Sequence, residues 1–499
     1  MLATSLTAAI VGVDAHLVRV EADTASGFPK FTMVGLPDSA VKESEGRIRA
    51  ALRNCGYGFK WDRRITVNFA PASLRKVGSS YDLATAIGLL AADGTAPGGS
   101  LSSLLLVGEL ALDGAVRSVS GVLPMMLMAR KQGLRAALVP AANVREAALV
   151  PGLDVYPVGS LLDAVELVAA ERRPAPPPPP SAAEPARGHP DLADVRGQAL
   201  ARRALEIAAA GGHNLLLAGP PGSGKTMLAR RLGSILPPLT AEEALEVTAI
   251  HSAAGSPLDA LVRARPFRSP HHTASDVALV GGGSIPRPGE ISLAHNGVLF
   301  LDELPEFRRS VLESLRQPLE EGSITISRVR GSLRLPARFQ FVGAMNPCPC
   351  GSSGGGACRC TPRQAAAYRS RISGPLLDRI DLHVEVPPLA WADLVGPRGE
   401  GSAAVATRVH RARARQMERG AGPNCFLAGE SLRRCAELDD DGRSLLATAM
   451  NALHLSARGH DRIVRVARTI ADLDGSAVVV GRHVAEALQF RRCGGDTNQ

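Results

Sequence analysis

Short apolar runs alternate with stretches of helical periodicity along the first part of the chain. Arg64–Phe69 alternates polar and apolar residues and Leu104–Val107 is continuously apolar, so both are predicted strands. Ser39–Asn54 and Asp82–Ala92 carry apolar residues at helical spacing and are predicted helices. The mixture predicts an α/β or α+β domain over residues 1–170.

The pattern changes after this region. Residues 171–187 are dominated by proline, which lacks a backbone donor and favours extended polyproline II, so they are predicted to form a stiff linker. Ala201–Ala210 is then a predicted helix and His213–Ala218 a buried parallel strand. The pattern predicts four parts: a first domain over 1–170, a linker over 171–187, an α/β core over 188–395 and a basic helical region over 396–499.

Composition excludes several classes of protein. The 499 residues are 45% hydrophobic and 21% charged, which is typical of a globular rather than a disordered or fibrous chain. No stretch reaches the roughly 18 uninterrupted apolar residues of a membrane helix, which argues against a membrane protein. The first residues lack a basic segment and reach Asp14 early, which argues against a secretory signal. We therefore expect a cytoplasmic protein.

The charge balance permits a polyanionic partner without requiring one. The formal net charge is +9, and aromatic residues make up only 3% of the chain. So few aromatics argue against a platform that grips single strands by base stacking. Any contact with nucleic acid is expected to run mainly from arginine and lysine to phosphate.

The clearest chemical signal is a glycine-rich loop after the strand that ends at Ala218. It matches G-x-x-x-x-G-K-[ST] and precedes a predicted helix over Met227–Leu232. Glycines let the backbone curl so that its N–H groups face phosphate oxygens, while the lysine contacts the β- and γ-phosphates and the threonine hydroxyl ligates Mg²⁺. The loop consists of Gly219, Pro220, Pro221, Gly222, Ser223, Gly224, Lys225 and Thr226.

Two further strands end in polar residues. Gly297–Glu303 is apolar until Asp302 and Glu303, so Asp302 is expected near Mg²⁺ and Glu303 is expected to orient and deprotonate the attacking water. Phe339–Asn346 ends in Asn346, which is expected between the tips of the other two strands, close to the γ-phosphate. Together with the loop these motifs predict a domain that hydrolyses ATP with Mg²⁺.

The combination resembles the ComM/YifB family of magnesium-chelatase-like AAA+ ATPases essentially from end to end. The resemblance implies a P-loop AAA+ core with a parallel sheet and helices on both faces, an N-terminal α+β Lon-protease-like domain and a C-terminal helical lid. It also implies a hexameric ring motor, and ComM-like members are DNA helicases that promote branch migration during natural transformation, so single-stranded or branched DNA is the expected partner. The motifs that carry the resemblance are Gly35–Lys42, Asp191–Gln198, the glycine-rich loop, Arg265–Thr273, Asp302 and Glu303, Asn346–Gly351, Ser373–Asp381 and Arg465–Asp472.

The resemblance also implies roles for single residues. Lys225 and Thr226 resemble the Walker A pair, Asp302 and Glu303 the Walker B pair, and Asn346 the sensor 1 residue.

Two arginines resemble residues that act on the terminal phosphate. Arg379 resembles an arginine finger, which would reach the γ-phosphate held by a neighbouring subunit. The alternative for Arg379 is an i,i+4 surface salt bridge. Arg465 fits the sensor 2 arginine of the lid best, with Arg462 as second choice.

Two insertions are expected in the core. The distance in sequence between Lys225 and Asp302 is long for a compact P-loop core, and 265–290 suits the hairpin that one clade inserts in helix 2. A second hairpin is predicted at Ile324–Leu335, with a turn near Gly331. Its arginines either line the pore of the ring and touch DNA phosphates or form a solvated face. They are Arg328, Arg330 and Arg334.

A cysteine quartet and a histidine pair are candidate metal ligands. Four thiolates suit a structural Zn²⁺ ion, although Cys-x-Cys is tighter than the usual spacing, so free thiols and disulfides stay open. For His271 and His272 a polar or DNA-facing role in a loop is favoured over metal binding. The quartet consists of Cys348, Cys350, Cys358 and Cys360.

The N-terminal region is expected to lack protease activity. By the resemblance, Ser80 stands where Lon-type proteases carry their nucleophile, but Leu123 stands where the lysine base would be. Three functions therefore compete: a ring motor on DNA, which we favour, a magnesium-chelatase motor subunit, and an ATP-dependent protease.

Overall fold

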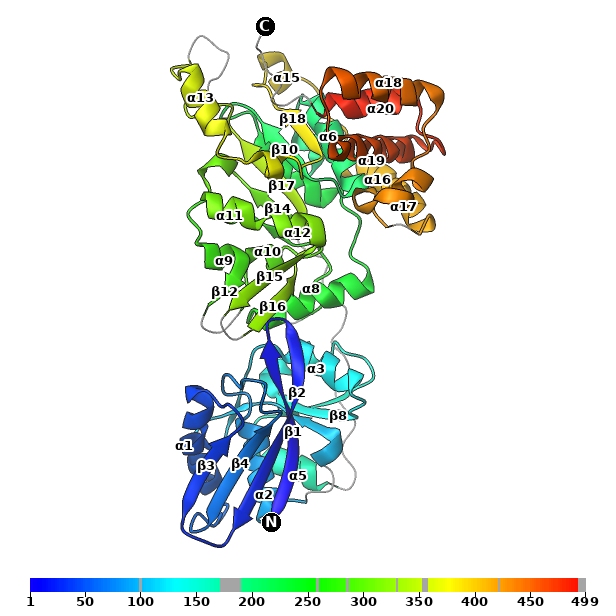
Figure 1. Cartoon of the computed structure of the whole chain (residues 1–499). Coiled ribbons are helices and arrows are strands. Elements are labelled where there is room, and N and C mark those ends of the chain that lie inside the picture. Colours follow the sequence, from blue (N-terminus) through cyan, green and yellow to red (C-terminus); the bar gives the residue numbers. More distant parts are fainter. Residues whose placement is uncertain are drawn as a thin grey trace.

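The chain folds into an N-terminal unit, a central α/β core and a C-terminal group of helices (Figure 1). The computed structural model describes residues 1–97, 101–170, 190–256, 260–283, 287–328, 331–351, 358–420 and 422–491. The proline-rich linker predicted over 171–187 and Arg330 lie outside the described residues. In the described part, no helix combines the length and the apolar character needed to cross a membrane.

A seven-stranded mixed sheet forms the N-terminal unit. Its order is β3-β4-β2-β1-β5-β8-β9, with β1, β2 and β4 antiparallel and the other neighbours parallel. The alternation in Arg64–Ala70 buries every second side chain, as predicted, because one face of that strand packs on the core. The strands are β1 (Leu2–Val11), β2 (Asp14–Ala25), β3 (Lys30–Val34), β4 (Arg64–Ala70), β5 (Leu104–Leu106), β8 (Ala136–Pro140) and β9 (Asp154–Val158), beside a small pair, β6 (Glu109–Leu110) and β7 (Val116–Arg117).

The helices predicted in this unit are present with the predicted bounds. Helix α1 (Ser39–Asn54) starts after Asp38, whose side chain accepts a hydrogen bond from the Val41 amide, as an N-cap does. Helix α2 (Asp82–Ala92) is buried along nearly its whole length against β1 and β2. The unit also contains α3 (Val122–Lys131), α4 (Val144–Ala147) and α5 (Leu161–Ala169).

The core is built on a five-stranded sheet of order β11-β14-β17-β10-β18, in which all neighbouring strands are parallel. Its central strands β14 and β17 are buried along their whole length, as expected for parallel strands that helices cover on both faces. The strands are β10 (Leu215–Ala218), β11 (Phe267–Arg268), β14 (Val298–Leu301), β17 (Gln340–Met345) and β18 (Leu382–Glu385). The helices are α6 (Ala199–Gly211), α7 (Lys225–Arg231), α8 (Ala241–Ala253), α9 (Asp276–Val280), α10 (Glu290–Leu293), α11 (Arg309–Ser314), α12 (Arg316–Glu321), α13 (Pro362–Arg369), α14 (Gly374–Leu377) and α15 (Trp391–Val395).

Both regions of the predicted insertions contain antiparallel strand pairs. In the first, β12 (Gly281–Gly282) pairs with β13 (Arg287–Pro288). In the second, β15 (Ser323–Arg328) pairs with β16 (Gly331–Pro336), which confirms the hairpin predicted from the alternation at 324–335. Arg328 pairs in register with Gly331 at the closed end of the hairpin.

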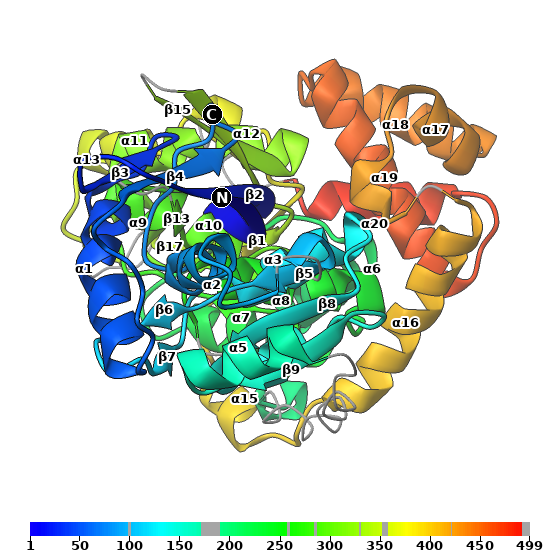
Figure 2. The ribbon, with the colours of Figure 1, turned by 90° about the horizontal axis from the view of Figure 1, so that it is seen from below.

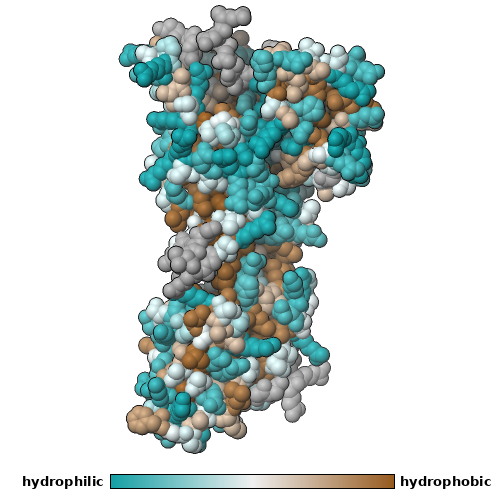
Figure 3. Space-filling model, in the orientation of Figure 1, coloured by the Kyte–Doolittle hydropathy of each residue, from teal (hydrophilic) through white to brown (hydrophobic). Residues whose placement is uncertain are grey.

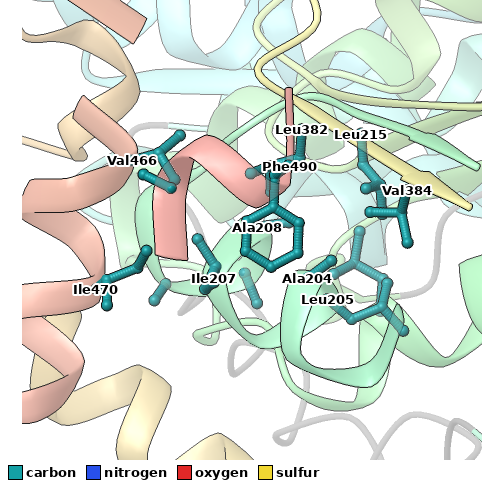
Figure 4. Packing of buried hydrophobic residues seen from close by; sticks show 14 of the residues in the cluster. Ala204, Leu205, Ile207, Ala208, Leu215, Leu382, Val384, Val466, Ile470 and Phe490 are labelled. Atoms are coloured by element: carbon teal, nitrogen blue, oxygen red, sulfur yellow. The ribbon is translucent and has the colours of Figure 1, made fainter. Parts of the chain in front are cut away.

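The C-terminal helices pack on the same sheet as the core helices. Phe490, Val466 and Ile470 of this region lie in one buried cluster with Ile207 of α6 and Leu382 of β18 (Figure 4). The lid is thereby joined to the sheet by apolar packing, a major favourable term in folding. Its helices are α16 (Ser402–Glu418), α17 (Gly429–Cys435), α18 (Asp440–Ala452), α19 (Ala457–Asp474) and α20 (Gly481–Gln489), and they lie to one side of the core (Figure 2).

Among the described residues, the N-terminal unit contacts the core at the β1–β2 turn and at helix α3. At the β1–β2 turn, a Cβ added to Gly12 would lie 2.7 Å from Leu333 Cδ1 of the β15–β16 hairpin, so the turn packs directly on that hairpin. Helix α3 lies against α8, where the Gly121 amide donates to the Ser252 carbonyl (3.1 Å) and the Ser252 hydroxyl donates to the buried Glu146. In Figure 3, apolar side chains are visible near this junction, and others are scattered among polar ones over the rest of this face.

Candidate active site

The glycine-rich loop connects the end of β10 to the start of α7. Gly222 and Gly224 have φ angles of +77° and +92°, a region that other residues adopt only with strain. A Cβ at Gly219 would lie 2.2 Å from the Val386 carbonyl oxygen, so the backbones approach too closely there for any side chain. The loop therefore depends on its glycines in the way that a phosphate-binding loop requires.

Lys225 is held inside this loop. Its ammonium group donates to the carbonyls of Gly219 (2.7 Å) and Pro220 (2.8 Å) and to Asn346 Oδ1 (3.2 Å), and the residue is 8% exposed. Burial lowers the pKa of Lys225, while the carboxylates of Asp302 and Glu303 oppose that shift. The Lys225 ammonium group thus donates to neutral carbonyl and amide oxygens. Charged phosphate oxygens would be stronger acceptors for the same group.

Thr226 and Asp302 lie together, although they are far apart in the sequence. The Thr226 hydroxyl donates to Asp302 Oδ2 at 2.6 Å, across the gap between the first turn of α7 and the end of β14. A hydroxyl and a carboxylate are hard oxygen donors, and Mg²⁺ binds such donors together with phosphate oxygens. The pair therefore fits the Mg²⁺ ion that the motifs imply.

Glu303 has an unusual backbone conformation and a partner that the sequence analysis did not identify. Its φ is +51°, and its side chain is 52% exposed. His272, in the loop after β11, places Nδ1 3.2 Å from Glu303 Oε2. The predicted polar role of this histidine thus takes the form of a contact with Glu303, which a local sequence signal could not reveal because the two residues lie on different loops.

Strand order brings Asn346 into the site. β17 lies between β14 and β10, so Asn346, which follows β17, stands between the ends of the strands that lead to Asp302 and to the loop. Its Oδ1 accepts the hydrogen bond from Lys225. The placement expected for Asn346 is confirmed, and its contact to nucleotide stays a prediction.

Arg379 lies at the other edge of the sheet. Its carbonyl accepts a hydrogen bond from Asn214 Nδ2 (3.0 Å), and Asn214 precedes β10, whereas the phosphate loop follows β10. β10 has four residues, so about 13 Å of strand separates its two ends. The Arg379 side chain is 8% exposed, pairs with Glu320 of α12 and donates to the Pro375 carbonyl, so its ion pair is not with an i,i+4 neighbour.

Arg465 and Arg462 of α19 lie at the edge where Arg379 lies, not beside the phosphate loop. Arg462 Nε is 3.8 Å from Asp381 Oδ1, and the Asp381 amide donates to the Asn214 carbonyl (3.1 Å). Burial alone would raise the pKa of Asp381, but a hydrogen bond from His213 and the charges of Arg462 and Arg465 outweigh burial and lower it. Burial in turn lowers the pKa of Arg462 to about 10. Action of Arg465 on nucleotide stays a prediction.

The cysteine quartet lies close to the phosphate loop. All four Sγ atoms lie within 4.8 Å of one another, and Cys348 is buried. In the same turn, a Cβ at Gly351 would lie 2.5 Å from ring atoms of Pro221 in the loop. Sequence spacing identified the thiols, but their contact with the phosphate loop only becomes visible in three dimensions.

Of the arginines proposed to contact DNA, Arg334 is the one whose side chain is described. It is exposed on β16, and its Nε donates to Ser323 Oγ (2.9 Å). Arg328 ends β15 at the tip of the hairpin.

The N-terminal unit has a leucine, Leu123, where the lysine base of a Lon-type protease is expected. Leu123 is fully buried, and its amide donates to Glu146. Lys76, four positions before Ser80, is also buried, but its ammonium donates to the carbonyls of Phe69 and Pro71. A lysine that is bound to two carbonyls in this way is held as a structural group.

Comparisons with known proteins agree with this geometry. The chain matches the families described as "Magnesium chelatase, subunit ChlI" over residues 191–394, "Subunit ChlI of Mg-chelatase" over 20–143 and "Magnesium chelatase, subunit ChlI C-terminal" over 399–491. It is 47% identical to competence protein ComM of Haemophilus influenzae, over 98% of this chain and 97% of that protein. Protein YifB of Escherichia coli is also 47% identical, over 97% and 96%. The magnesium-chelatase 38 kDa subunit of Rhodobacter capsulatus is 26% identical, over 54% of this chain and 76% of that protein. With a P-loop core, a helical C-terminal region and near full-length identity of this level, the chain belongs to the ComM/YifB-type family of magnesium-chelatase-like AAA+ proteins.

Proposed function

We propose that this chain is the ATP-hydrolysing subunit of a hexameric ring motor that acts on single-stranded or branched DNA in the cytoplasm. The ring would act as a helicase that promotes branch migration or strand integration during natural transformation or recombination. The near full-length likeness to a protein named for competence supports this choice. The observation that carries the proposal is that Lys225 and Arg379 lie at opposite ends of β10 in one chain.

One subunit would supply the residues that bind the triphosphate and the attacking water. Lys225 would exchange its carbonyl partners for β- and γ-phosphate oxygens, and the loop amides would bind the remaining oxygens. Bound Mg²⁺ supplies the charge that neutralises the phosphates, with Thr226 and Asp302 as its protein ligands. Glu303 would accept the proton of the attacking water, while Asn346 keeps the lysine and the water oriented.

The second half of the site would come from a neighbouring subunit. A guanidinium that acts on the γ-phosphate must approach within hydrogen-bond distance of it. Within its own chain, Arg379 is paired with Glu320 at one end of β10, and the loop lies at the other end. In a head-to-tail ring that edge meets the phosphate edge of the next copy, because such interfaces join two different surfaces of the same chain. Arg379 would then leave Glu320 for the transferred phosphoryl group.

DNA is the proposed substrate along which the ring moves. The net charge of +9 supplies a field that favours a polyanion. The β15–β16 hairpin carries Arg334 on its exposed surface and Arg328 at its end, which suits phosphate contact in a central pore. Phosphate contacts of this kind carry no sequence information, as branch migration requires.

ATPase and strand-displacement assays with different DNA structures test the proposal. Single-stranded DNA, duplex, forked DNA and a four-way junction are compared at one salt concentration, with Lys225→Ala as the inactive control. Stimulation by forks and junctions together with displacement of strands is the expected result. Equal turnover with and without every DNA would contradict the assignment of DNA as the partner.

One alternative has support from the comparisons. The family descriptions name magnesium chelatase, and the Rhodobacter capsulatus relative is a magnesium-chelatase subunit. A chelatase motor would drive insertion of Mg²⁺ into a porphyrin through a partner, and stimulation by such a partner with protoporphyrin would favour it. An ATP-dependent protease is disfavoured by Leu123, which stands where a catalytic lysine is required.

A further inference from the structure

The arrangement of the four thiols fits a tetrahedral metal site. Sulfur–sulfur distances are 3.4 Å for Cys348–Cys350, 3.8 Å for Cys348–Cys358 and 3.6 Å for Cys350–Cys358, and Cys360 completes the group. Four thiolates at about 2.3 Å from a tetrahedral Zn²⁺ lie about 3.8 Å apart. A disulfide would need about 2.05 Å between sulfurs. The described distances therefore match the edges of a zinc tetrahedron and exclude a disulfide between these three sulfurs.

The quartet differs from the other thiols of the chain. Cys55, Cys425 and Cys435 belong to no group of three or more candidate metal ligands within the described residues. Four polarizable sulfurs with no other ligand type favour Zn²⁺ over Mg²⁺ or Ca²⁺, which prefer oxygen.

The same turn is packed against the phosphate loop. The Gly351 amide donates to the Cys348 carbonyl (3.0 Å), and Gly351 has a φ of +81°. Its Cα faces the ring of Pro221 so closely that an added Cβ would lie 2.5 Å from Cδ and Cγ. Two residues before Cys348, Asn346 accepts the hydrogen bond from Lys225. The segment 346–351, which contains two of the cysteines, thus meets the phosphate loop at two points.

We propose that the four cysteines bind one Zn²⁺ ion and that this ion braces the phosphate loop through Gly351 and Pro221. A turn that is held by four metal–sulfur bonds keeps one position, since binding free energy at such a site is also folding free energy. The loop that rests on it then keeps the shape that binds nucleotide, so its affinity for nucleotide depends on zinc. The second half of this inference rests on the proposed function.

Metal analysis tests the site itself. Protein purified without added metal should contain about one zinc per chain, as expected for a four-thiolate site. Cys348→Ser/Cys358→Ser should lose the zinc, and Cys55→Ser, which removes an isolated thiol, should keep it. Because the double variant risks misfolding, the wild-type protein is also stripped with a chelator, and its cobalt-loaded form is tested for the absorption of a tetrahedral thiolate site. A folded wild-type chain without metal, or a double variant that keeps zinc, overturns the proposal.

Gly351→Ala tests the brace separately from the metal. An added methyl group must displace the Pro221 ring, because the two atoms cannot both fit, so this variant should keep its zinc and bind a fluorescent ATP analogue about tenfold more weakly. Chelated wild-type protein should show the same loss, and added Zn²⁺ should restore affinity. Unchanged affinity in both preparations would overturn the brace.

Lys225→Ala separates this inference from the proposed function. The variant should keep its zinc and lose the nucleotide. If it still binds the analogue at wild-type affinity, the ATP site is wrong while the metal site stands.

Discussion

The two edges of the five-stranded sheet carry different chemistry. At the carboxyl ends of β10, β14 and β17 lie the phosphate loop, two acidic residues and Asn346, joined by hydrogen bonds through Lys225 and Thr226. At the amino ends of β10 and β18, Arg379 pairs with Glu320, while the charges of Arg462 and Arg465 lower the pKa of Asp381.

Under the proposed function, each edge is one half of a site. The edge with the glycine-rich loop would hold the triphosphate with one lysine against its charge, while the other edge offers guanidinium groups and no phosphate loop. A head-to-tail assembly would bring these two edges of neighbouring copies together.

Removal of the lysine should have the largest effect on nucleotide binding, and without bound nucleotide no turnover remains. Lys225→Ala takes the only loop cation from the phosphate edge, and hydrogen bonds to charged groups contribute about 1.5–3 kcal/mol each, so nucleotide affinity should fall about a hundredfold or more. Equilibrium titration with a fluorescent ATP analogue measures the loss. Lys131→Ala, an exposed lysine of α3, is the matched control and should bind normally.

Removal of the proposed arginine finger should leave nucleotide binding intact and lower turnover. Arg379→Ala is expected to reduce kcat about a thousandfold, the lower end of the range for arginine fingers. Arg443→Ala, an exposed arginine that also pairs with a carboxylate, serves as the control.

Mixed rings test whether Arg379 acts across the subunit boundary. Arg379→Ala subunits still have a complete phosphate loop, and Lys225→Ala subunits still have the arginine. Mixing the two inactive variants should restore part of the activity. Full turnover by a verified monomer would show that hydrolysis does not require Arg379 of a neighbouring subunit.

Glu303→Gln should have an intermediate effect. The amide cannot accept the proton of water, so turnover should fall about a hundredfold, the lower end of the range for general bases, with ATP still bound. Steady-state phosphate release measures the turnover, and nucleotide titration measures the affinity for ATP. Glu306→Gln, on the next turn of the chain and paired with Arg371, should hydrolyse normally. Full DNA-dependent turnover by Glu303→Gln would remove its assigned role.

His272→Ala should have the smallest effect. A partly exposed polar contact of this kind contributes at most about 1 kcal/mol, so loss of the contact with Glu303 should lower kcat at most about fivefold and leave KM unchanged. His272→Gln, whose amide can replace the contact with the Glu303 carboxylate, should recover the rate. A rise in kcat instead would mean that His272 keeps Glu303 away from the water.

Elements and motifs that are local in sequence could be predicted. The bounds of Ser39–Asn54 and Asp82–Ala92 follow from their own periodicity, and the β15–β16 hairpin follows from alternation over adjacent residues. The phosphate loop was found because its residues are contiguous. Asn346 could be placed because a parallel sheet brings the carboxyl ends of neighbouring strands to one edge.

Contacts between distant segments could not be predicted. His272 and Glu303 meet from two loops, and Gly351 and Pro221 meet across the sheet edge, yet none of these residues has a local pattern that marks its partner. The pairing of Arg379 with Glu320 of α12 is of the same kind.

From the sequence alone we could predict a glycine-rich loop and acidic strand ends typical of phosphate and Mg²⁺ binding, a group of four closely spaced cysteines, and several helices and strands, because backbone propensity and hydrophobic periodicity act over a few residues. Tertiary structure decided that the arginines lie at the far edge from the loop, that the cysteine turn rests on Pro221 and that His272 holds Glu303. The reason is physical: these contacts arise only when burial of the apolar strands and helices fixes the order of the sheet and brings distant loops together.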